Sequence, residues 1–396
     1  MHILFPYLAR YRAVNWTRYH HLFGQLAAMG HRITVLQPPP AAIGETNFQE
    51  IEVELPPAIA LRDVAMPGWF WDRRWPLDKL VKKGSYGLVC RDTVERIVAE
   101  EAVDALIVYN LPQAGLLDIA PPRGRKLVRV FDLADDYEAM LAKELGRLAI
   151  GPLLWQGRRT LRGMLESADL VLSVSHSLAE DYPDRRIEVL PNGVDFARFD
   201  AVRAATEGRV GSAEPGRRLV VGYLGAFEYF IDFPLILDIA ARMPETRFRL
   251  IGAGRDFEAV RSAAAERGLD NVELPGPVPF HRVPAEIAAM DICLNLFVPI
   301  PISHKASPMK LFEYLAMGRP VLTSDLEEVR RYGVDFLVTV RSADEGAAAL
   351  ARLAADPAER ARLAEAGRDW VRAACDWKDI ANRLVELIEQ TADRMH

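Results

Sequence analysis

The chain has 396 residues, of which 50% are hydrophobic and 26% are charged, and its formal net charge is −6 at pH 7. This composition is typical of a globular protein, and the acidic balance argues against non-specific binding to nucleic acid. A chain of this length divides naturally into two domains of about 200 residues each.

The cysteines and the lack of long apolar segments indicate the environment. Cys90, Cys293 and Cys375 are widely separated and include no Cys-x-x-Cys pair, which argues against a disulfide framework or a structural zinc site. No window approaches about 18 uncharged apolar residues, and the apolar run after Met1 is too short for a signal peptide. We therefore expect a cytoplasmic protein that is soluble or attached to a membrane only at its surface.

The first half of the chain alternates predicted strands and helices. An apolar run at 1–5, a helical stretch at 17–29 closed by Gly30, and an apolar run at 32–36 form a βαβ unit, which implies a parallel sheet. Further apolar runs predict strands at 105–109, 127–131, 170–174 and 188–190. We assign residues 1–195 to a first Rossmann-like domain.

A second series of the same kind follows a linker, which we place at 196–218 because residues 201–218 lack periodicity and are rich in glycine and charge. Strands are predicted at 219–224, 248–252, 272–274 and 292–297, with helices at 235–243, up to about 267, and at 284–290. Residues 219–375 form the second predicted domain. An amphipathic helix at 377–391 lies within a terminal segment, 376–396.

The segment 307–322, Ser-Pro-Met-Lys-Leu-Phe-Glu-Tyr-Leu-Ala-Met-Gly-Arg-Pro-Val-Leu, carries the clearest chemical signal. It predicts a loop, a short helix ended by Gly318, and a strand. Leu311, Tyr314 and Leu315 form an apolar stripe that would pack on a sheet. Glu313 lies off this stripe near the helix start, where a carboxylate could accept hydrogen bonds from a sugar diol. The alternative is a solvated helix residue.

This segment and five others in register, 191–195, 222–225, 248–252, 271–276 and 289–292, resemble the retaining glycosyltransferases of family 4, glycosyl transferases group 1. The resemblance implies a GT-B fold: two doubly wound Rossmann-like α/β domains that face a cleft, with a C-terminal helix that crosses back to the first domain. It also implies that a hexose-type sugar is transferred from a nucleotide-diphosphate donor to a glycan or lipid-linked acceptor, in polysaccharide biosynthesis. The first domain would bind the acceptor and the second the donor, with Glu313 on the donor ribose.

The chain departs from this family pattern where the donor diphosphate would bind. Lys305 replaces a glutamate that contacts the donor sugar, and Ala226 and Tyr229 stand where many relatives carry an arginine and a lysine. A leaving diphosphate gains negative charge in the transition state, so other cations must replace those two. We expect Lys310, as a catalytic and donor-binding residue, and Lys305 to do so, helped by backbone amide groups at the helix start. That start comprises Pro308, Met309, Lys310 and Leu311.

Glycines at strand ends are further donor-site candidates. Gly225 and Gly252 end strands, where a missing side chain allows a ligand to approach the backbone. Such glycines also occur for purely structural reasons. Gly276 and Pro277 belong to a loop similar to the one that lies near the donor base in the family.

Three carboxylates follow a strand of the first domain, at Asp132, Asp135 and Asp136. Strand ends face the ligand crevice in doubly wound sheets, so we predict a catalytic role for Asp132 and acceptor binding by Asp135. Capping of the next helix by Asp135 or Asp136 is the alternative. No Asp-x-Asp occurs, so we expect neither a metal site nor the metal-dependent GT-A fold. The only other small molecule expected is the nucleotide sugar as co-substrate, with no cofactor.

Aromatic and basic residues between 67 and 83 could bind an acceptor or an anionic membrane. Trp69 and Trp71 are the acceptor candidates, with Lys79, Lys82 and Lys83 just beyond. The alternative is a loop packed against the first domain, and the stretch 147–162 carries the same ambiguity. Two other functions stay open, a sugar-nucleotide epimerase of GT-B shape and a nucleotide-sugar-binding protein without catalysis.

Overall fold

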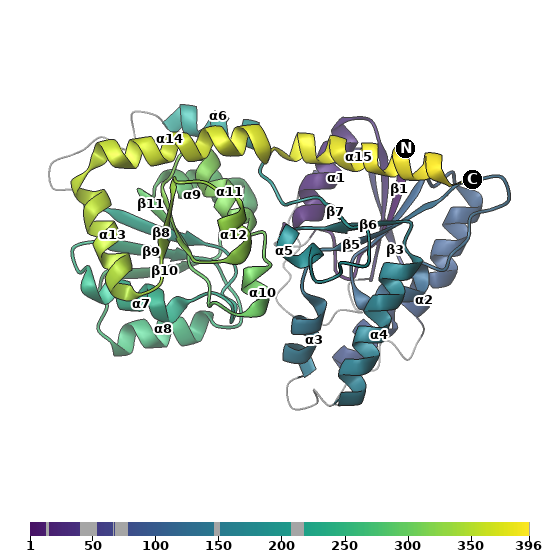
Figure 1. Ribbon diagram of the computed structural model, residues 1–396, viewed down its shortest axis with the longest axis horizontal. Coiled ribbons are helices and arrows are strands. Elements are labelled where there is room, and N and C mark those ends of the chain that lie inside the picture. Colours follow the sequence, from purple (N-terminus) through teal and green to yellow (C-terminus); the bar gives the residue numbers. More distant parts are fainter. Residues whose placement is uncertain are drawn as a thin grey trace. The chain divides into compact units, whose positions relative to one another are not determined.

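The computed structural model describes residues 1–12, 16–39, 54–65, 67, 78–145, 151–206 and 218–395. The chain divides into two compact units, shown in Figure 1. The first comprises Met1–Pro191 together with Lys378–His396, and the second comprises Asn192–Trp377. The C-terminal segment therefore belongs to the first unit, as the predicted returning helix requires.

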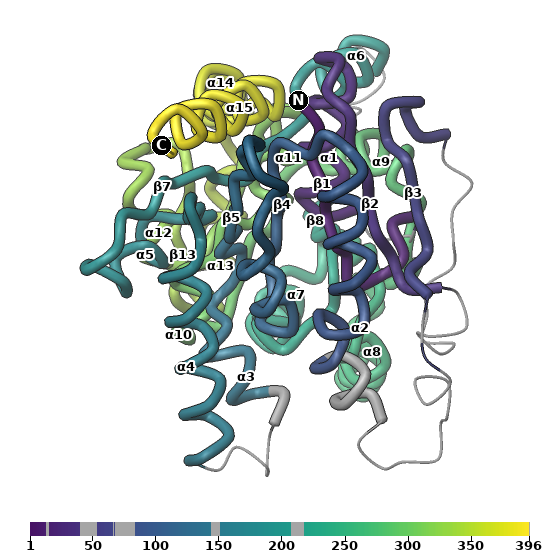
Figure 2. Tube along the Cα trace, turned by 90° about the vertical axis from the view of Figure 1, so that its right-hand side faces the viewer, coloured from purple at the N-terminus to yellow at the C-terminus, as the bar shows by residue number. Residues whose placement is uncertain are grey.

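The first unit is built on a seven-stranded sheet in the order β3-β2-β1-β4-β5-β6-β7, with every described strand pair parallel. Figure 2 looks onto this unit, with β3 and β7 at opposite edges. The strands are β1 (His2–Pro6), β2 (Arg32–Gln37), β3 (Ile59–Asp63), β4 (Ala105–Val108), β5 (Val128–Leu133), β6 (Leu170–Ser173) and β7 (Glu188–Val189). The order reverses direction between β1 and β4, which is the usual ligand-binding position in a doubly wound sheet.

Helices cover both faces of this sheet because alternate strand residues point to opposite sides. Leu4 packs in one cluster with residues of α2 and α4, whereas its neighbour Phe5 contacts Tyr19 and Phe23 of α1. The helices are α1 (Arg18–Ala28), α2 (Asp78–Glu100), η3 (Leu111–Leu116), α3 (Tyr137–Leu145), α4 (Gly151–Ser167), α5 (His176–Ala179) and α15 (Trp377–Arg394). Strands buried on both faces explain the continuous apolar runs in the sequence.

The second unit has a six-stranded parallel sheet in the order β10-β9-β8-β11-β12-β13. Its strands are β8 (Val220–Leu224), β9 (Arg247–Ile251), β10 (Val272–Gly276), β11 (Ile292–Asn295), β12 (Val321–Ser324) and β13 (Leu337–Val340). Its helices are α6 (Phe196–Thr206), α7 (Phe233–Arg242), α8 (Phe257–Glu266), η5 (Phe280–Arg282), α9 (Val283–Ala288), α10 (Pro301–His304), α11 (Met309–Ala316), α12 (Glu327–Arg331), α13 (Ala343–Ala355) and α14 (Pro357–Ala374). Here the order reverses between β8 and β11.

The structure differs from the sequence prediction in the linker and in several further elements. Residues 196–206 of the predicted linker form helix α6 in the second unit, where Phe196 and Phe199 enter the hydrophobic core. Strands β3 and β13 were not predicted, and neither were several helices, among them α2, α4, α12, α13 and α14. Within the described ranges, no helix combines the length and the apolar character needed to cross a bilayer.

Candidate functional site

Helix α11 lies at the reversal point of the second sheet, between the ends of β8 and β11. Tyr314 fixes it there, because its hydroxyl accepts a hydrogen bond from Leu224 N at 2.8 Å and donates to Leu224 O at 3.1 Å. Asn192 holds the preceding loop, donating from its side chain to Ser307 O at 2.6 Å and from its backbone to Ser307 Oγ at 3.3 Å. The motifs at 191–195 and 307–322 thus form one structure.

Lys310 occupies the centre of this region. Its Nζ lies 3.3 Å from Tyr223 Oη, 4.9 Å from the centre of the Tyr223 ring and 5.0 Å from the centre of the Phe297 ring. Tyr223 belongs to β8 and Phe297 follows β11, so the ammonium group lies at the reversal point itself. Burial lowers the pKa of Lys310 to about 8, against the opposing charge of Glu313. The lysine is therefore mainly cationic at pH 7 and half-buried, as an anion-binding group should be.

Glu313 lies one helical turn further along α11 and is only 9% exposed. Among the described residues, its carboxylate accepts no hydrogen bond and forms no ion pair within 4.0 Å, and its oxygens are not among the fully enclosed polar atoms that lack a partner. Burial raises its pKa to about 7, and the charges of Lys310 and Arg198 oppose this rise. The structure thus contradicts the alternative of a solvated helix residue. A buried carboxylate without a partner is suited to receive a ligand that donates hydrogen bonds.

The candidate glycines of the second unit line up across three neighbouring strand ends. A Cβ atom on Gly225 would lie 2.9 Å from Lys310 Cε, so this glycine makes room for the lysine side chain. A Cβ atom on Gly252 would clash with the Gly225 carbonyl oxygen, and Gly252 N donates to Gly276 O at 3.0 Å. Gly276 has a φ of +85° with open space around it, and the adjacent Pro277 is exposed. At Gly225 and Gly252 the missing side chain thus makes room for other atoms of the protein, which was the structural alternative, and their contact with a donor stays a prediction. Around the Cα atom of Gly276 the space is open.

The remaining residues at the start of α11 fall into two groups. Pro308 is buried and directly precedes the helix, and Met309 begins its first turn, whose amide groups lack carbonyl partners within the helix. Leu311 is different, because its side chain lies in the hydrophobic core and its amide donates to Pro308 O at 3.1 Å. We therefore propose no donor contact for Leu311, contrary to the expectation from the sequence. Lys305 lies half-buried at the end of α10, a separate element.

An arginine that the sequence did not single out lies beside one of the positions where cations are missing. The Arg255 guanidinium lies 5.5 Å from the centre of the Tyr229 ring and 2.9 Å from Glu228 Oε2. Arg255 follows Gly254 in the loop after β9, and its side chain is 61% exposed. The sequence signal that could have identified Arg255 is its position directly after the glycines that follow β9. It adds a second cation to the strand ends that surround Lys310.

In the first unit, Asp132 forms a buried ion pair. Arg18 Nε and Nη2 donate to its two carboxylate oxygens at 2.9 and 3.3 Å, with side-chain exposures of 5% and 2% for arginine and aspartate. Arg18 also donates to Leu190 O at 3.2 Å. Because this carboxylate is held on both oxygens, its partner cannot be removed without leaving a buried charge. We therefore assign Asp132 a structural role instead of the expected catalytic one.

The two following carboxylates have separate roles. Asp136 Oδ1 accepts from Ala139 N at 3.0 Å, so Asp136 caps α3, which was one of the alternatives. Asp135 is exposed. The surrounding protein and the charges of Asp132 and Asp136 raise its pKa, and contact with water moderates that effect. Asp135 remains the acceptor-site candidate of this strand end. In the described parts of the chain, no group of three His, Cys, Asp or Glu side chains is arranged to hold a metal ion.

The structure describes only part of the two aromatic and basic segments, 67–83 and 147–162. Trp69 and Trp71 lie outside the described residues. In the other segment, helix α4 exposes Leu153 by 43% and Trp155 by 58%, and the Arg159 guanidinium lies 5.4 Å from the Trp155 ring centre.

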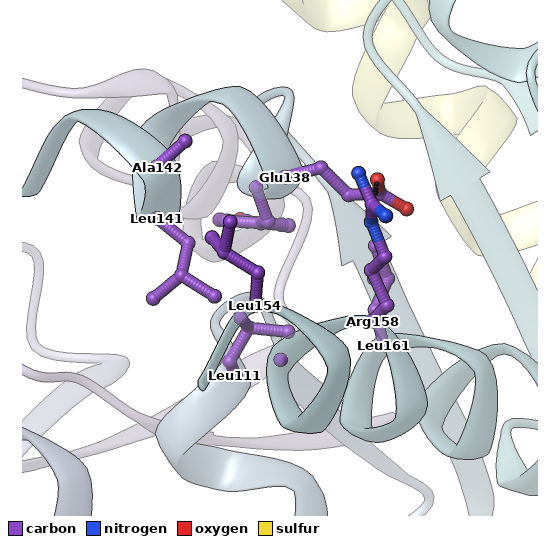
Figure 3. A pocket seen from close by; sticks show the side chains of 9 residues that line it. Leu111, Glu138, Leu141, Ala142, Leu154, Arg158 and Leu161 are labelled. Carbon is purple, nitrogen blue, oxygen red and sulfur yellow. Dashed lines mark hydrogen bonds and ion pairs between the residues drawn. The ribbon is translucent and has the colours of Figure 1, made fainter. Parts of the chain in front are cut away.

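Beside these side chains, α3, α4 and η3 enclose a small cavity of about 40 Å³ (Figure 3). Its lining is mostly apolar, with an ion pair of 2.8 Å between Arg158 and Glu138. The lining residues are Leu111, Tyr137, Glu138, Leu141, Ala142, Leu154, Gly157, Arg158 and Leu161.

Comparison with protein families and curated proteins gives consistent matches. A model described as glycosyl transferase-like matches residues 234–386, and one described as a glycosyl transferase 4-like domain matches residues 16–193. A teichuronic acid biosynthesis glycosyltransferase of Bacillus subtilis is 28% identical over 141 residues, 36% of this chain and 35% of that protein. A GDP-mannose-dependent phosphatidylinositol monomannoside mannosyltransferase of Mycobacterium tuberculosis is 26% identical over 273 residues, 63% of this chain and 69% of that protein.

Solved structures agree over nearly the whole chain. Sucrose-phosphate synthase from Thermosynechococcus elongatus has a TM-score of 0.74 at 16% identity, covering 98% of both chains. Anabaena HepE in complex with UDP and glucose has a TM-score of 0.67 at 15% identity, covering 98% of this chain and 99% of that one. At such identities the likeness concerns the fold, and it confirms the predicted two-domain GT-B architecture.

Proposed function

Since the chain belongs to the family-4-like glycosyltransferases of group 1, we propose that it moves a hexose from a nucleotide-diphosphate sugar to a glycan or lipid-linked acceptor, with retention of configuration. Glu313 carries this proposal. It is buried, and no described residue hydrogen-bonds its carboxylate, so both oxygens can accept hydrogen bonds from the two hydroxyl groups of a ribose. Bonds of this kind to a charged acceptor are stronger than neutral ones.

Lys310 supplies the electrostatic part of the reaction. The bond from the sugar C1 to the diphosphate breaks, the bond from C1 to the acceptor oxygen forms, and the acceptor proton passes to the leaving phosphate. Negative charge on the diphosphate therefore grows on the way to the transition state. The half-buried Lys310 side chain and the backbone amides of Met309 and Lys310 at the start of α11 support its stabilisation. Arg255 and Lys305 are additional candidates for this role.

The test is to identify the donor and then follow the product. UDP- and GDP-linked hexoses, the donor types of two similar proteins, are titrated into the protein by calorimetry. A productive donor is then incubated with soluble glycans and with lipid-linked glycans, and the anomeric configuration of the product is read by NMR. An inverted product would contradict the retaining mechanism, and donor epimerised without transfer would favour the epimerase instead.

We also propose that the protein attaches reversibly to an anionic membrane through α4. Residues 151–165 carry three arginines and no acidic residue, and Leu153 and Trp155 are exposed beside them. Exposed rings and leucines next to cations suit an acidic lipid surface, where each cation contributes about 1 kcal/mol. Such attachment would give a cytoplasmic, membrane-peripheral enzyme access to a lipid-linked acceptor.

Co-sedimentation with acidic and neutral vesicles at low and high salt tests this attachment. The variant Leu153→Ser/Trp155→Ser should lose binding to acidic vesicles, whereas Leu88→Ser, which changes the exposed Leu88 on α2, should retain it. A Trp69→Ser/Trp71→Ser variant tests the other segment separately. Equal absence of the wild type from all pellets would contradict membrane attachment and leave a soluble acceptor.

A further inference from the structure

Arg198 occupies a defined position at the start of α6, inside the segment expected to be a linker. Asp195 Oδ1 accepts from Arg198 N at 3.2 Å and thereby caps the helix. Phe196 and Phe199 enter the core of the second unit, and Arg198 between them is half-buried. Because α6 packs against α9 and α11, its first turn lies next to the candidate donor site.

The guanidinium group of Arg198 holds the segment that follows β10. It lies 4.2 Å from the centre of the Phe280 ring, and its Nη2 donates to Phe280 O at 3.2 Å. This combination of stacking and hydrogen bonding uses the planar shape of arginine, which lysine lacks. Phe280 begins η5, three residues after Pro277. Arg198 therefore fixes the loop of Gly276 and Pro277 against α6.

The same guanidinium acts electrostatically on Glu313. Arg198 and Lys310 are the two cations that favour the ionised form of this carboxylate, and Arg198 does so without an ion pair within 4.0 Å. The negative charges of Asp195 and Glu313 in turn support the partly buried Arg198. The side chain of Tyr314, whose hydroxyl is bound to Leu224, also senses the charge of Glu313.

We propose that Arg198 is a positioning residue of the donor site, which fixes the loop after β10 against α6 and favours the charged form of the neighbouring Glu313. This inference rests on the proposed function, because it takes Glu313 as the ribose ligand. It assigns two separable contributions to one side chain. The contact with Phe280 shapes the site at every pH, whereas the charge matters only where Glu313 titrates.

Two substitutions separate these contributions. Arg198→Gln removes the charge and keeps a hydrogen-bond donor, whereas Arg198→Lys keeps the charge and loses the planar group. Arg282→Gln is the matched control, because it removes one exposed positive charge from the same unit, and its described partner is Glu286. Thermal unfolding identifies any variant that is damaged as a whole.

Affinity for UDP-glucose and GDP-mannose is measured by calorimetry between pH 5.5 and 8.5, with whichever of them binds the wild type. These donors are used because their phosphates do not titrate in this range. For Arg198→Gln we expect the affinity to fall by roughly three- to tenfold at pH 6.5, because without the positive charge more of Glu313 is protonated. The loss of affinity should shrink as the pH rises, since Glu313 then ionises even without Arg198. Arg198→Lys should lose affinity to a similar degree at all pH values, and Arg282→Gln should follow the wild type.

The outcomes are distinct. A loss for Arg198→Gln that does not depend on pH would overturn the electrostatic role, and wild-type affinity in both Arg198 variants would overturn the positioning role altogether. If the wild type and every variant fail to bind either nucleotide sugar while remaining folded, the proposed donor site itself is wrong.

Discussion

Glu313→Gln removes a buried negative charge while nearly conserving the volume of the side chain. Burial raises the pKa of Glu313 from 4.5 to about 7, and one pKa unit corresponds to about 1.4 kcal/mol. Ionising Glu313 in the folded protein therefore costs about 3 kcal/mol above pH 7. We expect the variant to be more stable than the wild type by up to that amount, and to bind a nucleotide sugar more weakly by roughly 1.5–3 kcal/mol because charged hydrogen bonds are lost.

The sign of the stability effect depends on pH in a defined way. Because the folded pKa lies above the unfolded one, the wild type binds more protons when folded, and its stability falls as the pH rises from about 4.5 to 7. Denaturant unfolding at pH 5 and pH 8 should therefore show a gain in stability for Glu313→Gln at pH 8 that falls to about a quarter of that size at pH 5. Glu266→Gln, at an exposed position on α8, is the control and should show neither effect. A variant less stable than the wild type at pH 8 would refute the reasoning, since it would mean that the carboxylate has a stabilising partner.

Three further predictions concern the diphosphate side of the site. Lys310→Ala should lower kcat more than donor affinity, because the diphosphate gains charge as its bond to the sugar breaks. Lys305→Ala should have the same effect to a smaller degree. Full turnover of both variants would contradict the role of the two lysines. Gly225→Ala should reproduce the Lys310→Ala kinetics, because the new Cβ would lie 2.9 Å from Lys310 Cε and the backbone of Gly225 has a φ of +154°. Normal kinetics of this variant would show that the position of the lysine side chain is unimportant. Activity should persist in excess EDTA, and a loss rescued by manganese or magnesium would reopen the role of Asp135.

Much of the fold was predictable because its strands are buried on both faces and appear as continuous apolar runs. Helix α6 was not, since its apolar residues show little helical periodicity and a segment rich in glycine and charge follows it. Strand β13 was missed for a similar reason, because three of its four residues are only half-buried or exposed.

The site was predictable where function depends on local sequence and not where it depends on distant partners. The candidate role of Glu313 came from its surroundings in the chain, but its burial did not, because α11 is enclosed from residue 311 to 316 by elements from elsewhere in the sequence. Asp132 looked free for catalysis because Arg18, its partner, lies 114 residues away. Arg198 was overlooked because Phe280 lies 82 residues away.

The division of the chain has a consequence for its synthesis. The second unit is one continuous segment, Asn192–Trp377, whereas the first also needs Lys378–His396. Residues of α15 such as Leu384, Leu387 and Ile388 are buried, so their binding partners stay uncovered until α15 has left the ribosome. The unit whose synthesis begins first is thus completed only after the second unit has been made, and a chain that stops before Lys378 would expose apolar surface to chaperones and proteases.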